Sequence, residues 1–169
     1  MFKKLQKKFA LVIVLALASQ VQAKDYGTNI VNSLNTNNVY VGLQSSYPAH
    51  GLSLKMDLDS KISVQGILGF LGTINSYTVR GIYKFKKEQF YNLYGFGSLG
   101  MMSWNGSSTY ADETIFGIGG GGGLEYDLRG IDRTFIPLYL NFELNFNLTD
   151  FDHYNMSVAG LGLGLHYKF

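Results

Sequence analysis

The stretch Ile136-Pro-Leu-Tyr-Leu-Asn-Phe-Glu-Leu-Asn-Phe-Asn-Leu148 carries the pattern on which the fold depends. Apolar residues occupy every second position, and the positions between them are mostly Asn, with Glu143 near the centre. Because successive side chains of a β-strand point to opposite faces, this period of two indicates a strand with one apolar and one polar face.

The same period recurs along most of the chain. We predict eight strands, at about 39–44, 52–58, 62–70, 77–85, 90–101, 114–128, 136–148 and 157–169. The facing of the fifth strand is ambiguous, because Tyr91, Leu93 and Leu99 compete with Tyr94 and Phe96 for the apolar side. No sustained helical period and no change of composition marks a second domain, so the 169 residues predict one all-β unit.

The polar face of these strands consists of Gly, Ser, Asn, Gln and charged residues, which cannot form a dry core. The apolar face is aromatic towards the strand ends, at Tyr77, Phe85, Phe116, Tyr126, Phe146, Tyr167 and Phe169. Leaving that face in water would cost roughly 1.5–3 kcal/mol for each large side chain. Lipid removes this cost, and backbone pairing in lipid requires a closed sheet. The predicted fold is an all-β, eight-stranded antiparallel up-and-down transmembrane β-barrel.

The first 23 residues have a different character. Four lysines precede the ten-residue apolar run Phe9–Ala18, and Val21-Gln-Ala23 follows it. The run is shorter than the roughly 20 residues of a transmembrane helix, so residues 1–23 predict a secretory signal peptide cleaved after Ala23. Residues 24–36 then form a flexible periplasmic lead-in and 37–169 the barrel. From Lys24 onward ten basic residues face twelve acidic ones, without a basic patch for nucleic acid.

Six charged residues fall on the predicted inner face, where they form a hydrophilic conduit or a gate, or else a satisfied ion-pair network. They are Lys55, Asp57, Arg80, Lys84, Glu125 and Glu143. We favour the network, because buried charges need partners and eight strands leave little room for a channel. The glycines at 117, 119, 121 and 123 either make room for Tyr94 and Phe96 or let the wall curve sharply.

Motifs for catalysis or cofactor binding are weak. Gly117-Ile-Gly-Gly-Gly-Gly122 matches a dinucleotide fingerprint in form only, since no βαβ unit surrounds it. The chain has no Cys. We expect His50 and His153 in loops and His166 on the inner face, and none of the three has a second His nearby. Metal sites need clustered ligands, so His153 with Asp150 and Asp152 is at most a weak cation site. The sequence thus predicts no enzyme, catalytic residue, cofactor or metal.

The last six residues, Gly164-Leu-His-Tyr-Lys-Phe169, resemble the C-terminal signal of bacterial outer-membrane barrels. The resemblance implies that the barrel-assembly machinery recognises Gly164, Tyr167 and Phe169, and that the protein lies in the cell outer membrane among lipid and lipopolysaccharide. As an architecture, the whole mature chain is similar to the small eight-stranded outer-membrane proteins of the opacity-protein and OmpA-transmembrane-domain type. We expect no peptidoglycan-binding domain after the barrel, and hence no cell-wall tether.

The predicted external connections are about 46–51, 71–76, 102–113 and 149–155, and the periplasmic turns 59–61, 86–89 and 129–134. Loops on a rigid scaffold often carry binding function, so the sequence favours a structural or surface-interaction, adhesin-like role, with host or surface proteins as partners and no large open pore. A porin-like channel for small solutes or ions, and a soluble periplasmic barrel binding an apolar ligand, are the alternatives.

Overall fold

The computed structural model describes residues 38–71, 74–105, 112–148, 152 and 157–169. The chain divides into two units, Met1–Leu34 and Asn35–Phe169, and only the second contains described residues. The predicted signal peptide, its cleavage at Ala23 and the lead-in 24–36 lie outside the described residues and stay predictions.

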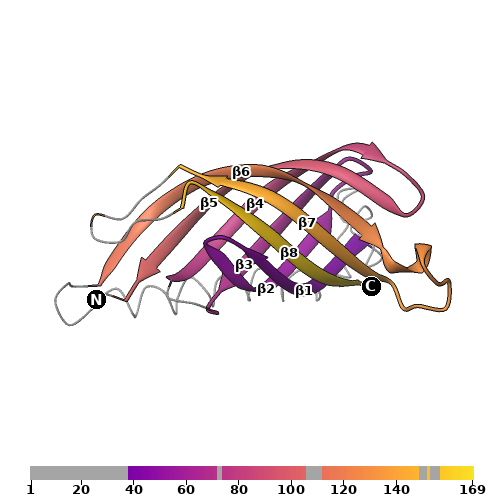
Figure 1. The fold of residues 1–169 in the computed structure, drawn as a ribbon, viewed down its shortest axis with the longest axis horizontal. Coiled ribbons are helices and arrows are strands. Elements are labelled where there is room, and N and C mark those ends of the chain that lie inside the picture. Colours follow the sequence, from indigo (N-terminus) through magenta and orange to yellow (C-terminus); the bar gives the residue numbers. More distant parts are fainter. Residues whose placement is uncertain (1–37, 72–73, 106–111, 149–151, 153–156) are drawn as a thin grey trace, which may run out of the picture. The chain divides into compact units, whose positions relative to one another are not determined.

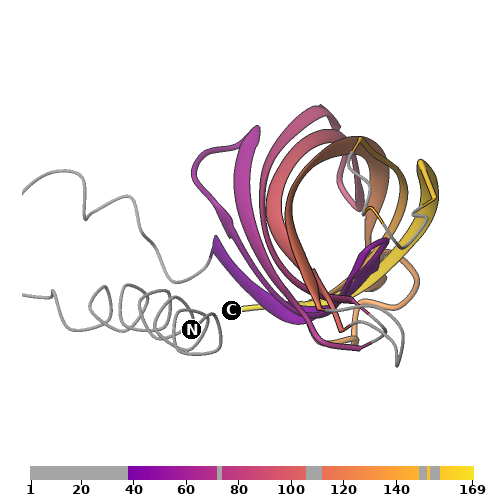
Figure 2. The ribbon, with the colours of Figure 1, turned by 90° about the vertical axis from the view of Figure 1, so that its left-hand side faces the viewer.

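Eight strands close into an antiparallel barrel in which each strand pairs with its neighbours in sequence and the last pairs with the first. The ring is seen end-on in Figure 2. The strands, labelled in Figure 1, are β1 (Val39–Ser46), β2 (Ala49–Asp57), β3 (Ile62–Gly69), β4 (Ile74–Lys87), β5 (Tyr91–Trp104), β6 (Glu113–Asp127), β7 (Leu138–Asn147) and β8 (Ala159–Lys168). The all-β, eight-stranded up-and-down barrel predicted from the sequence is confirmed.

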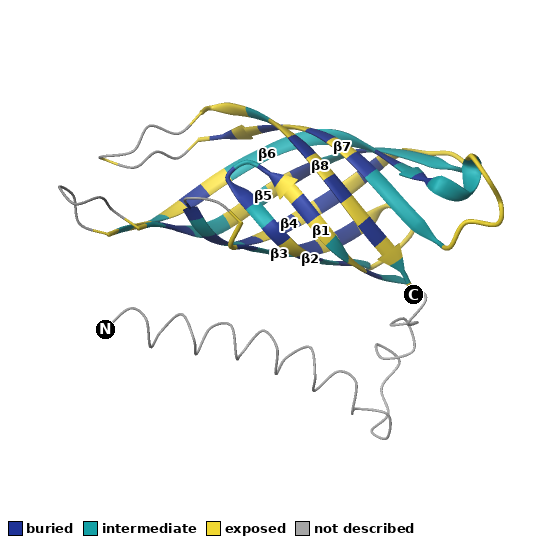
Figure 3. Cartoon of the chain, turned by 60° about the horizontal axis from the view of Figure 1, so that its bottom comes forward, coloured by how far each residue is buried: buried dark blue, intermediate teal, exposed yellow. Residues whose placement is uncertain are grey.

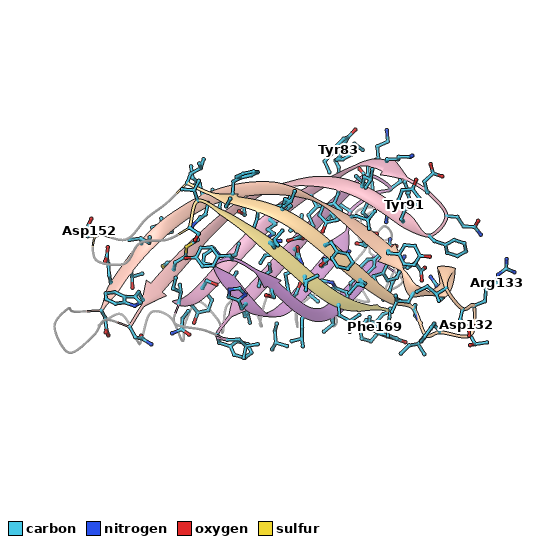
Figure 4. All side chains as sticks on the ribbon, viewed as in Figure 1. Tyr83, Tyr91, Asp132, Arg133, Asp152 and Phe169 are labelled. Carbon is cyan, nitrogen blue, oxygen red and sulfur yellow. The ribbon has the colours of Figure 1, made fainter. Side chains whose placement is uncertain are left out.

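Connections at one end of the barrel join β1 to β2, β3 to β4, β5 to β6 and β7 to β8, and we call it the loop end. The other end, here the termini end, holds the remaining connections and the bond from Phe169 N to Val39 O at 2.9 Å. The β6–β7 connection includes the 3-10 helix η3 (Leu128–Gly130). In Figure 4, Asp152 marks the loop end, and Asp132 and Arg133 mark the termini end.

Several connections are shorter than predicted, because the hairpin ladders continue further. Ser45 pairs with His50 and Ser46 with Ala49, which leaves a two-residue turn, Tyr47–Pro48, where we predicted a loop over 46–51. His50 therefore lies in β2 and not in a loop. Likewise β5 continues to Trp104, so the single Trp belongs to a strand end and not to the third loop.

Alternating burial along the strands is visible in Figure 3 as bands of blue and yellow. On β7, Asn141, Glu143, Asn145 and Asn147 are buried, whereas Phe142 is 50% and Leu144 61% exposed. The ambiguity in the fifth strand is resolved: Tyr94 and Phe96 are buried inside, and Leu99 points outward, 67% exposed. The barrel thus has a polar interior and an apolar outer surface. None of the helices in the described residues is long and apolar enough to span a membrane.

Candidate functional site in the barrel interior

All six charged residues expected on the inner face point into the barrel. Lys55 and Asp57 come from β2, Arg80 and Lys84 from β4, Glu125 from β6 and Glu143 from β7. Five of them are at most 4% exposed, and Asp57, near the termini end, is partly buried. Each lies at an inward position of its strand, so strand alternation alone brings charges from four strands into one narrow space.

These six residues form three ion pairs. Lys55 pairs with Glu125, the Arg80 Nη1 atom lies 2.9 Å from Glu143 Oε2, and the Lys84 Nζ atom lies 2.7 Å from Asp57 Oδ1. Three cations and three anions balance the charge of this set. Buried charges are costly unless they are paired and hydrogen-bonded, so this arrangement describes a satisfied network.

Among the described residues of this network, Glu143 accepts hydrogen bonds from the most donors. Beside Arg80, its carboxylate accepts hydrogen bonds from the Tyr94 hydroxyl at 2.7 Å, from Gln44 Nε2 at 3.1 Å and from the Ser46 hydroxyl. These donors come from β1, β4 and β5, so one carboxylate joins four strands across the interior. Charge-assisted bonds of this kind are roughly twice as strong as neutral ones.

A second group surrounds Asp57. Its carboxylate accepts hydrogen bonds from the Ser63 hydroxyl at 2.6 Å and from the Tyr40 hydroxyl at 2.9 Å, in addition to Lys84. The Lys55 ammonium lies 4.1 Å from the centroid of the Tyr40 ring, a favourable cation–π geometry. Tyr40 therefore links the Lys55 pair to the Lys84 pair.

Sequence reasoning missed the neutral partners Tyr40, Gln44, Ser46, Ser63 and Tyr94. Their signal was present, since each occupies an inward position of its strand. What the sequence lacks is the register that decides which inward side chains meet.

Histidines serve no metal site within the described residues, where no group of three or more His, Asp or Glu side chains is placed to hold an ion. His166 lies inside, as predicted, with its Nε2 atom 2.9 Å from the Ser53 hydroxyl. Both residues are buried, at most 3% exposed. His50 bonds to Ser45 at 2.9 Å near the loop end, and His153 and Asp150 lie outside the described residues.

Glycines provide the space that the aromatic residues of β5 occupy. A Cβ atom on Gly121 would lie 2.8 Å from the ring of Phe96, and one on Gly123 would lie 2.8 Å from the ring of Tyr94. Of the two roles expected for these glycines, making room for Tyr94 and Phe96 is therefore supported at Gly121 and Gly123.

The outer surface is aromatic near both ends of the barrel. Tyr83, Phe85, Tyr167 and Phe169 are exposed towards the termini end, and Phe70, Phe116 and Phe146 towards the loop end. Figure 4 shows Tyr83 and Phe169 at the outside of the wall. Between the two groups lie mainly aliphatic side chains, such as Val41, Val79, Ile118 and Leu163.

The three residues of the predicted assembly signal lie on β8 and just after it. Gly164 faces inward, next to Gln44 and Asn141, whereas Tyr167 and Phe169 face outward with their ring centroids 5.0 Å apart. Their recognition by an assembly machinery stays a prediction.

Two carboxylates in the connections at the termini end have hydrogen bonds that stabilise their charged form. Backbone N–H groups of Lys61 and Ile62 lower the pKa of Asp59, and the N–H and hydroxyl groups of Thr134 lower that of Asp132. Both side chains are exposed, so these bonds order the connections locally.

Comparison with known proteins supports the fold. No protein-family model and no curated protein matches the chain. Among solved structures, the crystal structure of the N-terminal β-barrel domain of Pseudomonas aeruginosa OprF is similar, with a TM-score of 0.58 and 18% sequence identity. The match covers 79% of this chain and 98% of that domain. The described barrel therefore has the fold of a small, OmpA-like eight-stranded barrel.

Proposed function

We propose that the chain is an integral protein of a bacterial outer membrane, exported by a signal peptide that is cleaved after Ala23. The inverted polarity of the wall carries this proposal. Large apolar side chains such as Leu144 on β7 and Leu161 on β8 are 61% and 77% exposed, while Glu143, next to Leu144 on β7, is 3% exposed. Such a surface is stable in lipid and unfavourable in water, and a closed barrel leaves no unpaired strand edge.

The aromatic groups at the two ends support this placement, because amphipathic rings favour the two membrane–water interfaces. In this orientation the termini end faces the periplasm and the loop end faces outside, with lipid and lipopolysaccharide around the wall. Gly164, Tyr167 and Phe169 then present the last strand to the barrel-assembly machinery.

The role we propose is structural or surface-interacting, adhesin-like, with host or surface proteins as partners and without catalysis. At the loop end, the Asp152 backbone N–H donates to Glu113 Oε1 at 3.0 Å, so the β7–β8 connection contacts the first residue of β6, where the β5–β6 connection ends. This contact supports a joint surface made by both. The ion pairs inside support a barrel without a large open pore.

The test combines location with loop deletion. Folded barrels of this kind migrate differently on gels before and after heating, and the protein should fractionate with outer membranes in the heat-modifiable form. Shortening the β5–β6 connection, residues 105–112, should abolish surface adhesion and leave the gel shift intact. Recovery of the mature chain in the detergent-free soluble fraction would contradict the membrane proposal and favour a soluble periplasmic barrel. Unchanged adhesion would contradict the surface role alone.

A channel for small solutes or ions is the second candidate, favoured by the charged interior. It requires the Arg80–Glu143 and Lys55–Glu125 pairs to separate, since both pairs are buried in the interior of the barrel. Planar-bilayer recordings on the purified barrel should give no stable large conductance. Reproducible large openings that persist after the β5–β6 deletion would establish the channel instead.

A further inference from the structure

One small cavity inside the barrel lies on the loop-end side of Arg80. Its volume is about 20 Å³. Its lining includes Thr78, Arg80, Phe96, Met102 and Asn145. A volume of roughly 10–15 Å³ on this measure already accommodates one water-sized particle. The cavity is therefore large enough for a single small guest.

Three of the lining residues have buried polar atoms without a hydrogen-bond partner in the described part of the protein. The atoms are Thr78 Oγ1, Arg80 Nε and Asn145 Nδ2, and their residues are at most 7% exposed. An unsatisfied buried polar group costs roughly 1–3 kcal/mol, so three of them around one cavity point to a missing partner.

The chemistry of these atoms selects an acceptor. Arg80 Nε and Asn145 Nδ2 can only donate, and the Thr78 hydroxyl can donate as well. A water molecule has two lone pairs for three donors and needs acceptors for its own hydrogens. A spherical anion accepts from all three. The rest of the lining combines the apolar side chains of Phe96 and Met102 with polar side chains, at Ser46, Ser98 and Asn147.

The Arg80 guanidinium also has an unused donor edge at this position. Glu143 shares the Arg80 guanidinium through the Nη1 atom, and its carboxylate is stabilised by Tyr94, Gln44 and Ser46 in addition. The Nε edge of Arg80 is not used by that carboxylate. One edge of the guanidinium thus completes the ion pair, and the Nε–H donor on another edge is left for a further acceptor.

We propose that this cavity is a binding site for a single halide ion, held by Arg80 Nε, Asn145 Nδ2 and the Thr78 hydroxyl. The small volume favours a monoatomic anion over sulfate or phosphate, whose oxygens spread over a larger space. The proposal does not depend on the role of the loops, because the three donors belong to strands β4 and β7 of the barrel wall.

The test is diffraction from the folded barrel crystallised from detergent with sodium bromide, using X-rays at the bromine absorption edge. We expect one anomalous peak in contact with Arg80 Nε. An ordered water at that place, without anomalous scattering, would overturn the proposal.

Variants give an independent check. Thr78→Val with Asn145→Ala removes two donors and should abolish the bromide peak, while Arg80 keeps its pair with Glu143. The matched control is Ser76→Ala, which removes another buried hydroxyl without a partner, two positions away on β4 and outside the cavity lining. It should retain the peak.

Heat-modifiable gel mobility identifies the variants that fold. Line broadening in chloride-35 NMR repeats the binding measurement in solution, and we expect it to be lost in the double variant and kept in the control. A peak that survives in the folded double variant would refute these ligands.

Discussion

Strands β6 and β7 are neighbours in the barrel and fill its interior in opposite ways. Inward positions of β7 carry Asn141, Glu143, Asn145 and Asn147, whereas the β6 positions paired with the last three are Gly123, Gly121 and Gly119. On the other side of β7, Gly162 and Gly160 of β8 pair with Glu143 and Asn145. The interior of a small barrel is thus shared between strands: one supplies bulk and charge, and its neighbours supply room.

The largest effect is expected from removing the charge that β7 contributes. Glu143→Leu would leave Arg80 buried without its partner, and we expect a loss of about 3–5 kcal/mol in the free energy of unfolding. Urea unfolding in detergent, followed by Trp104 fluorescence, measures it. Because paired apolar replacements restore much of such a loss, Arg80→Met combined with Glu143→Leu should regain most of the stability. A single variant as stable as the parent would show that the pair is dispensable.

The outward side of β7 gives the next prediction. Phe142 is central on this strand and 50% exposed, so Phe142→Lys would place a charge on the lipid-facing surface and cost about 2–4 kcal/mol if it lies near the midplane. The apolar control is Phe142→Leu. Unfolding in lipid vesicles measures the difference between the two variants. A lysine that is tolerated as well as leucine would indicate that water, and not lipid, covers this wall.

Adding bulk to β6 tests the other half of the comparison. A Cβ on Gly123 would lie 2.6 Å from the Phe142 backbone O and 2.8 Å from the Tyr94 ring, so Gly123→Leu overpacks the interior and should cost about 1–3 kcal/mol. Gly97 of β5 faces outward, and a Cβ there would meet no atom within 4 Å. Gly97→Leu is therefore the matched control and should unfold at nearly the parent urea concentration. Equal destabilisation of both variants would argue against a role of the glycines in packing.

A comparison of β7 with β5 also explains what could be predicted from the sequence. On β7 every position has a side chain that prefers one face, so the strand and its facing follow from alternation. On β5, by contrast, Gly95, Gly97 and Gly100 carry no preference and the aromatic residues fit either face, so only closure of the barrel decides that Tyr94 and Phe96 turn inward.

The ion pairs were predicted as a set of inward charges and not as pairs. Lys55 and Glu125 are 70 residues apart, and Arg80 and Glu143 are 63 apart. Which of three cations meets which of three anions depends on strand register and tilt around the whole ring. The cavity beside Arg80 depends in addition on rotamers, and no sequence pattern reports it.

The smallest effect is expected in the connection between the two strands, where Asp132 contrasts with the buried Glu143. The Thr134 N–H and hydroxyl groups donate to Asp132 Oδ1 at 2.9 and 2.8 Å and lower the pKa of this exposed carboxyl below its ordinary value of 3.8. A lowered pKa in the folded state means that these bonds contribute fully to the stability of the fold above pH 3.8, and that this contribution is lost as the pH falls through the folded-state pKa.

NMR titration of the Asp132 carboxyl carbon should give a midpoint below 3.8. Thr134→Val removes the hydroxyl donor and keeps the N–H, so it should move this midpoint part of the way back to 3.8. Because the group is exposed, the difference in urea unfolding midpoint between the parent and Thr134→Val should hardly change between pH 7 and pH 3; a large change in that difference would mean that the Asp132 bonds contribute more to stability than those of an exposed carboxyl.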